Sequence, residues 1–196
     1  MALQIVKNNK VIQNFPPEIF GKDSQEIAKA LSEIPLWSKQ KVIKDKDKFI
    51  SLEDKLYESR AYCKIEISKV AMYLPNEWRT HFFKQLDNLM DAVNWEADDP
   101  PITGASFNTF LRMLLELWPV KHPGLGVSND GNIIAAWTTG RDRLTIECFP
   151  NDKVRWVVSR YLEDERESAA VITQVSRLIA TLQPYSPSDW FDIDKK

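Results

Sequence analysis

Side chains that commonly carry out catalysis or bind metals are few in this chain. Its 196 residues include two histidines, His81 and His122, and two cysteines, Cys63 and Cys148. None has a second histidine or cysteine at the short spacing that a zinc site requires, and two cysteines make no disulfide framework. A G-x-x-x-x-G-K-[ST] loop, a G-x-S-x-G elbow and an H-E-x-x-H motif are also absent from the sequence. We therefore predict no catalytic residue, no metal site and no cofactor.

Carboxylates leave one route to catalysis open. The chain has 28 aspartates and glutamates, and carboxylates from separate loops can meet in space and act as an acid–base pair. Spacing along the chain does not reveal such a pair. A hydrolase or nuclease with carboxylates assembled from loops is therefore the alternative to a non-enzymatic function.

Basic and aromatic residues also gather in one stretch, which raises the possibility of nucleic-acid binding. Four arginines lie there with two aromatic residues that can stack on bases: Arg141, Arg143, Arg155, Arg160, Trp137 and Tyr161. Glu147 lies in the same stretch and offsets Arg155, and the net charge of −2 gives no overall attraction to nucleic acid. We do not expect nucleic acid to be the partner.

The stretch from about 124 to 161 has the clearest structural pattern. Turn residues at Asp130-Gly131 and at Gly140 divide it into apolar runs of strand length. Pairing Trp137 with Leu144, and Leu144 with Val158, gives both hairpins one register that collects apolar side chains on one face. Glu147 then falls opposite Arg155 on the other face. The run 133–137 is apolar on both faces, which predicts a strand that is covered on both sides.

Helical periodicity precedes this meander. Ser51 is expected to cap a helix that ends near Pro75, although residues 61–72 also alternate as a strand would. Asn76 is expected to cap a helix whose inner face runs from Trp78 to Val93, and Ser106 to cap one over 107–118. The last of these is apolar on nearly every side, so we expect it to pack on the meander. Further upstream, a short helix over 23–33 and a lysine-rich solvated loop over 39–48 are predicted.

Acidic residues follow the meander and predict a closing helix. Glu163-Asp164-Glu165 would complement the dipole of a helix N-terminus, and an apolar stripe continues through Val171, Val175, Leu178 and Leu182. The predicted fold class is therefore α+β, with N-terminal helices, a three- to four-stranded antiparallel meander over about 124–161 and a closing C-terminal helix. We expect one α+β domain over 1–185 and a tail over 186–196, which either packs across the body or is recognised by a partner.

Three motifs of this chain resemble those of a family of small bacterial proteins to which no activity is assigned. They are L-P-x-x-W at 74–78, S-F-x-x-F-L-R at 106–112 and D-G-N-x-x-A-x-W at 130–137. The resemblance covers residues 74–161, and its motifs are structural in character. It implies a bacterial or mobile-element source, and it supplies no functional residue.

These observations favour a non-enzymatic interaction or accessory protein that binds another protein, with an antitoxin, immunity or defence role as its most specific version. Self-association through an uncovered edge of the meander would make a homodimer. The candidate partner-binding residues are Trp137, Arg155, Tyr161, Trp190 and Phe191. The sequence shows neither the apolar core of a signal peptide nor an uncharged apolar run of membrane-spanning length. We therefore predict a cytoplasmic protein without a membrane partner.

Overall fold

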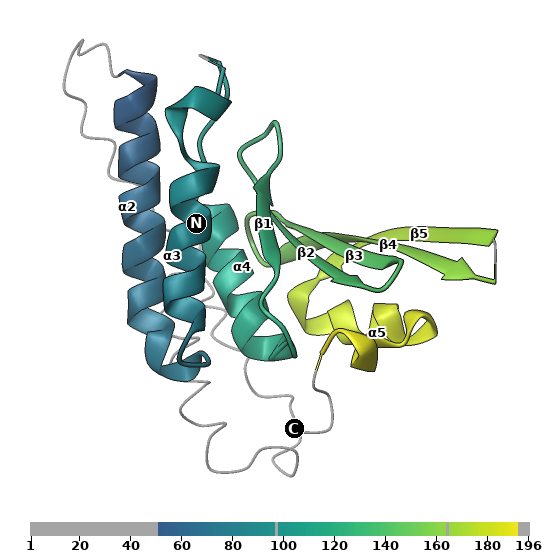
Figure 1. Cartoon of the computed structure of the whole chain (residues 1–196). Coiled ribbons are helices and arrows are strands. Elements are labelled where there is room, and N and C mark those ends of the chain that lie inside the picture. Colours follow the sequence, from purple (N-terminus) through teal and green to yellow (C-terminus); the bar gives the residue numbers. More distant parts are fainter. Residues whose placement is uncertain (1–50, 97, 164, 192–196) are drawn as a thin grey trace, which may run out of the picture.

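The structure is a computed structural model that describes residues 51–96, 98–163 and 165–191. The predictions for the helix over 23–33, the loop over 39–48 and the end of the tail at 192–196 lie outside the described residues. A layer of helices stands beside an antiparallel sheet, and the sheet extends beyond the helices as a two-stranded ribbon (Figure 1). The architecture is α+β, as predicted.

Two of the helices lead the described chain. Helix α2 spans Leu52–Val70 and continues into the 3₁₀ turn η1, Ala71–Tyr73. It begins where predicted, because the Ser51 hydroxyl accepts a hydrogen bond from the backbone N–H of Asp54 at 3.1 Å. Helix α3 spans Trp78–Leu89 and is followed by the 3₁₀ turn η2, Ala92–Asn94. Its N-cap is Glu77 rather than Asn76, and because the helix ends at Leu89, Val93 lies exposed instead of on the inner face.

Helix α4, Gly104–Leu117, is the central buried helix. All of its residues except Ala105 and Glu116 are buried, and it packs on strands β2 and β3, as the apolar sequence predicts. Its N-cap is Thr103, not Ser106, which lies in the first turn and is fully buried. The prediction was wrong because the Ser106 hydroxyl bonds to the sheet instead of to the N-terminus of its own helix.

Five antiparallel strands form one sheet in the order β1-β2-β3-β4-β5. They are β1 Gly124–Val127, β2 Ile133–Thr139, β3 Asp142–Cys148, β4 Lys153–Leu162 and β5 Glu165–Gln174. The predicted register is confirmed: Trp137 pairs with Leu144, Leu144 with Val158, and Glu147 with Arg155. The prediction of three to four strands was one or two too few, because β5 lies beyond the predicted range of about 124–161.

Strand β5 replaces the first part of the predicted closing helix. It pairs with β4 over ten residues without interruption, from Lys153 opposite Gln174 to Leu162 opposite Glu165. Glu163 has a φ of 56° and Glu165 is paired with Leu162, so these two acidic residues belong to a hairpin and not to the start of a helix. The helical part is short: the 3₁₀ turn η3, Val175–Arg177, the helix α5, Leu178–Leu182, and two further 3₁₀ turns, η4 Gln183–Tyr185 and η5 Pro187–Asp189.

The two faces of the sheet differ in cover. Helices α4 and α5 lie against the inner face of the sheet. This face carries the buried side chains of β2, β3 and β4, which are Ile133, Ala135, Trp137, Leu144, Ile146, Cys148, Val154, Trp156 and Val158. On the outer face, Ile134 and Ala136 are only half-buried. The prediction that this strand is covered on both sides was therefore wrong for the outer face.

The described part of the tail packs on the body. The carbonyl of Trp190 accepts a hydrogen bond from the backbone N–H of Val120 at 3.2 Å, and Phe191 forms a β-bridge with Pro119. The ring of Phe191 meets that of Trp137 edge-on, with centroids 5.7 Å apart. The helices among the described residues are all too short or too polar to cross a membrane.

Candidate interaction surface

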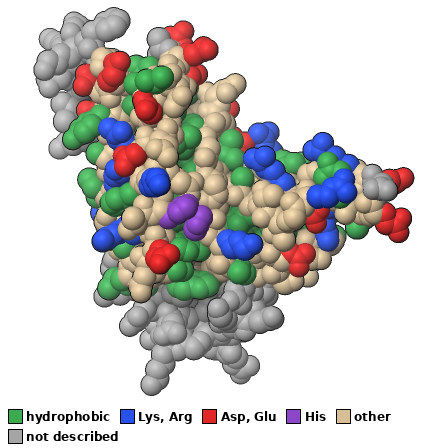
Figure 2. All heavy atoms as spheres, viewed as in Figure 1, with side chains coloured by type: hydrophobic (Ala, Val, Ile, Leu, Met, Phe, Trp, Pro, Cys, Tyr) green, Lys and Arg blue, Asp and Glu red, His purple; other side chains and the backbone are tan. Residues whose placement is uncertain are grey.

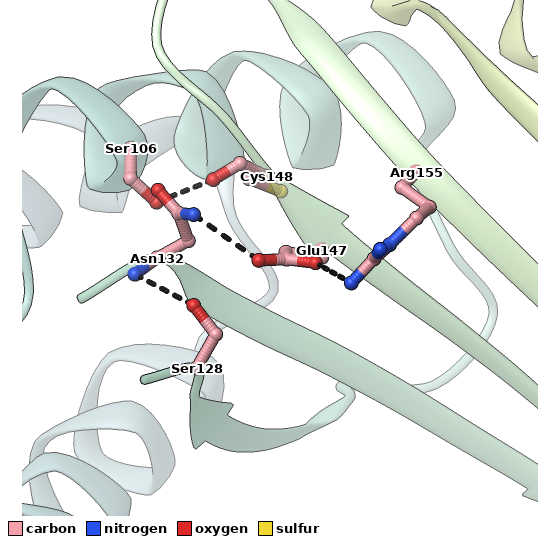
Figure 3. A network of polar contacts seen from close by, with 6 residues as sticks. All are labelled: Ser106, Ser128, Asn132, Glu147, Cys148 and Arg155. Atoms are coloured by element: carbon pink, nitrogen blue, oxygen red, sulfur yellow. Dashed lines mark hydrogen bonds and ion pairs between the residues drawn. The ribbon is translucent and has the colours of Figure 1, made fainter. Parts of the chain in front are cut away.

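Two of the three sequence motifs, S-F-x-x-F-L-R and D-G-N-x-x-A-x-W, meet in a network that joins helix α4 to the sheet (Figure 3). The hydroxyl of Ser106 donates to the carbonyl of Cys148 at 2.6 Å and accepts from the backbone N–H of Ile133 at 2.8 Å. The amide of Asn132 donates to Glu147 at 3.1 Å. The other carboxylate oxygen of Glu147 accepts from Arg155 at 2.5 Å. The motif residues are therefore positioned to hold the helical layer and the strands together.

This network has a structural role, because its reactive groups are already engaged. The Ser106 hydroxyl is fully buried and makes two backbone hydrogen bonds, so it is not exposed as a nucleophile. Glu147 is 5% exposed, and both of its oxygens accept hydrogen bonds. Burial raises the pKa of the Cys63 and Cys148 thiols well above the ordinary value, which keeps them protonated and unreactive.

The two histidines lie together on the surface, although 40 residues separate them in the sequence. The rings of His81, on α3, and His122, before β1, have centroids 3.4 Å apart with an interplanar angle of 30°. Trp78 meets His122 edge-on at 6.2 Å. The histidine atoms form one patch on the face shown in Figure 2. Desolvation lowers the pKa of His81, and the nearby His122 and Lys84 lower it further.

Two surface hollows add little chemistry to this arrangement. One, of about 420 Å³, is lined by Lys121, His122 and Arg143 and by a single carboxylate, Asp189. The other, of about 360 Å³, has Asp99 as its single carboxylate. Neither hollow brings together the two carboxylates that an acid–base pair needs. Among the described residues, no group of three histidine, cysteine, aspartate or glutamate side chains is arranged to hold a metal ion.

The two edges of the sheet differ, and this difference is more informative than the hollows. The first edge, strand β1, is short, and a side chain of helix α3 covers it. Strand β1 has four residues and follows Pro123. The side chain of Gln85, on α3, donates to the carbonyl of Pro123 at 3.0 Å and accepts from the backbone N–H of Leu125 at 2.7 Å. A side-chain amide thus satisfies two of the backbone groups that another strand would use at this edge.

The second edge, β5, is long and open. It has ten residues, and no other described segment pairs with its outer side. Its charges are confined to Glu165, Arg166 and Glu167, and residues 168–174 contain no charge, proline or glycine. Ile172 is 64% exposed and Val171 is 39% exposed. The β4–β5 ribbon projects from the body (Figure 1), so its edge is accessible to another chain.

Two of the predicted partner-binding residues lie beside this edge. Arg155 and Tyr161 are on the outer face of β4, opposite Ile172 and Arg166 of β5. Arg155 is ion-paired with Glu147, and the guanidinium of Arg141 lies 4.1 Å from the ring centroid of Tyr161.

The other three predicted residues, Trp137, Trp190 and Phe191, are buried in the core. Trp137 lies on the inner face, and its indole N–H donates to the carbonyl of Lys121 at 2.8 Å. Trp190 and Phe191 are held against the segment that follows α4. Their aromatic side chains therefore stabilise the fold and are not available to a partner in this structure.

Sequence reasoning missed β5 as a surface, because its apolar residues continue into a stripe with helical spacing. The run of uncharged residues over 168–174, rich in β-branched side chains, is the pattern that favours a strand instead. No family model, no curated protein and no solved structure matches this chain.

Proposed function

We propose that this chain is a non-enzymatic protein that binds another protein chain by strand addition at the β5 edge. The observation that carries the proposal is the contrast between the two edges of one sheet. Gln85 closes the four-residue edge β1, whereas the ten-residue edge β5 carries no such cover among the described residues. A long exposed edge strand is a template for pairing, and natural proteins usually protect such an edge.

Strand addition would use both the backbone and the side chains of this edge. Unpaired N–H and C=O groups along β5 supply hydrogen bonds to an incoming strand, and the alternating side chains supply specificity. The outer face next to the edge carries apolar and charged groups in adjacent positions: Ile172 is paired with Arg155, and Ala170 with the exposed Val157. Figure 2 shows hydrophobic, basic and acidic side chains interspersed on the projecting arm.

The more specific antitoxin, immunity or defence role was suggested by the lack of catalytic motifs and by the aromatic residues of the sequence, and it stays a prediction. The hydrolase or nuclease alternative gains no support from the two hollows, because each is lined by a single carboxylate. Binding at the edge needs neither a cofactor nor a metal.

Affinity purification with an edge variant tests the proposal. The tagged full chain is recovered from its host beside Ala170→Lys/Ile172→Lys, which places two charges on exposed positions of β5. The matched control, Thr138→Lys/Thr139→Lys, adds the same charge to exposed positions at the end of β2. We expect the wild type and the control to retain a stoichiometric protein chain, and the β5 variant to lose it, because lysine on an edge strand opposes pairing.

Hydrogen exchange on the recovered complex locates the contact. A bound strand should slow exchange at β5 amides whose N–H groups point away from β4, and leave β1 amides unchanged. A partner that binds the β5 variant as well as the wild type would contradict the proposal. So would a complex in which β5 exchanges as fast as in the free chain, or recovery of no stoichiometric protein at all.

A further inference from the structure

We infer that the strand which occupies the β5 edge is β5 of a second copy of this chain, paired antiparallel about a two-fold axis at Ala170. The inference rests on the proposed function and names its partner. It would join two five-stranded sheets into one continuous sheet. Each remaining end of that sheet would then be a β1 edge, which Gln85 already closes. Self-pairing therefore leaves no uncovered β5 edge, whereas binding through β1 would leave both β5 edges open.

The alternation of faces limits the registers that such a pair can adopt. Directly opposed residues of antiparallel strands point to the same face of the sheet. If the inner faces of both copies lie on the same side of the joined sheet, the two-fold axis passes through one residue of β5. That residue is then opposite the same residue of the second copy. A centre at Ala170 places Val171 opposite Ala169 of the second copy, and Ile172 opposite Ser168. It also places Thr173 opposite Glu167, and Gln174 opposite Arg166.

The charges select this centre from its neighbours. A centre at Arg166 or Glu167 would set each of these residues opposite its own copy, and directly opposed like charges destabilise a sheet. A centre at Ala169 would place Val171 opposite Glu167. A centre at Val171 avoids charge but pairs a shorter part of β5, 168–174 instead of 166–174. The Ala170 register thus gives the longer pairing, and both charged residues of the paired part, Arg166 and Glu167, meet an uncharged polar residue.

The two ends of β5 also have complementary charge. The turn end carries Glu163, Glu165 and Glu167 with Arg166, and Arg160 of β4 is paired with Glu167. The other end lies beside Lys153, which is paired with Gln174, and the exposed Arg177 of η3, whereas the nearby Asp152 is ion-paired with Arg112. Antiparallel pairing brings the acidic end of each copy next to the basic end of the other. Such complementarity favours association with a second copy and disfavours the parallel arrangement, in which like ends would meet.

The arrangement also accounts for an edge composition that would otherwise promote aggregation. Residues 168–174 combine β-branched and small side chains with no charge and no proline. A segment of this kind on an exposed edge is an aggregation hazard, and a closed assembly removes the hazard by covering the edge. A two-fold pair is closed, because each copy uses the same edge once.

Cysteine cross-linking of the full chain tests the register. Directly opposed residues have Cα atoms about 4.5–5.5 Å apart, within the 4.4–6.8 Å that a disulfide spans. Ala170→Cys should therefore form a covalent dimer on mild oxidation. Ser168→Cys is the matched control: its two copies would lie four residues, or about 13 Å, out of alignment. It should cross-link only when mixed with Ile172→Cys. The native cysteines are both buried and do not compete.

Light scattering of the wild type gives the second readout. We expect the mass to rise with concentration from that of the 22.7 kDa chain toward twice that value. The Ala170→Lys variant, which opposes lysine to lysine, should remain monomeric. Ala170→Glu should also be monomeric, and an equal mixture of the two should restore the dimer, because opposite charges then meet.

The outcomes separate this inference from the proposed function. A wild type that stays monomeric at every concentration, or a dimer in which Ser168→Cys cross-links alone and Ala170→Cys does not, overturns the self-pairing. The proposed function survives that result if a different protein is recovered with the wild type and lost with Ala170→Lys/Ile172→Lys. If the chain is monomeric and the β5 variant keeps every partner, both the inference and the proposed function fail.

Discussion

The backbone N–H of Leu125 donates a hydrogen bond to the side-chain oxygen of Gln85 at 2.7 Å. This bond ties helix α3 to the outer edge of strand β1, and the same side chain also satisfies the carbonyl of Pro123. The helical layer therefore protects one edge of the sheet. The opposite edge, β5, lies on the projecting ribbon, beyond the helices (Figure 1). The asymmetry between these edges is the basis of the proposed association through β5.

Removing the edge cover should cost stability. Gln85→Ala leaves the N–H of Leu125 and the C=O of Pro123 without their partner, so we expect the free energy of unfolding to fall by about 1–3 kcal/mol. Urea denaturation measures this change, and the amide of Leu125 should exchange faster with solvent. Asn88→Ala, an exposed change on the same helix, is the control and should be neutral or slightly stabilising. Equal stability of the two variants would show that the Gln85 bonds contribute nothing.

Ser106 is expected to be the most sensitive polar position of helix α4. Its hydroxyl joins β2 and β3 through Ile133 and Cys148 and has no contact with solvent. Ser106→Ala leaves the N–H of Ile133 without that partner in the core, which should cost about 1–3 kcal/mol. Ser68→Ala provides the comparison, because that exposed hydroxyl bonds only within its own helix. If Ser106→Ala unfolds at the same urea concentration as the wild type, the hydroxyl is not a structural link.

Asn132 should be intolerant of a negative charge. Its amide lies 3.1 Å from the buried Glu147, so Asn132→Asp would place two carboxylates side by side. Their repulsion should lower the free energy of unfolding by about 2–4 kcal/mol near neutral pH. The loss should shrink as the pH falls toward 4, because a proton taken up by the folded pair removes the repulsion. Asn129→Asp, on the exposed turn, should show neither effect, and a pH-independent loss at Asn132 would refute the electrostatic explanation.

The register of β2, β3 and β4 was predictable because local patterns determine it. Alternation places Trp137, Leu144 and Val158 on one face, and Gly131 and Gly140, both at positive φ, mark the turns. A slip by one residue would expose all of these apolar side chains, so the pattern allows one solution. Strand β5 lacks this constraint, because most of its side chains are exposed on both faces. Val171 and Val175 share a helical spacing although one ends up in a strand and the other in a 3₁₀ turn.

The contacts that protect the β1 edge and join helix α4 to the sheet could not be predicted from the sequence, because they link distant positions. Gln85 and Leu125 are 40 residues apart, and Ser106 and Cys148 are 42 apart. No periodic pattern links such pairs. Tryptophan and phenylalanine near the C-terminus suggested a recognition segment, but apolar aromatic rings gain more from burial, and Phe191 is fully buried. Composition identified the aromatic residues, and only the fold separates those in the core from those on the surface.

The stacked histidines predict a pH dependence of stability whose sign follows from the lowered pKa of His81. Desolvation first, and then the charges of His122 and Lys84, disfavour the protonated form in the folded chain. The unfolded chain keeps the ordinary value of 6.5, so as the pH falls through that value the unfolded state binds the proton before the folded state does. The stabilising contribution is therefore present above the ordinary pKa and is lost as the pH falls.

His81→Phe keeps a ring against His122 and removes the titrating group. The fall in the free energy of unfolding between about pH 7.5 and 5.5 should therefore be smaller in this variant than in the wild type. In NMR titrations of the imidazole protons, the His81 midpoint should lie below 6.5 in the wild type. It should rise in His122→Phe, because that change removes a neighbouring positive charge. Lys84→Met should raise it less, since Lys84 is the smallest of the three causes. A His81 midpoint at or above the ordinary value would mean that the two rings do not stack in solution, and the pH dependence would then have to come from the carboxylates.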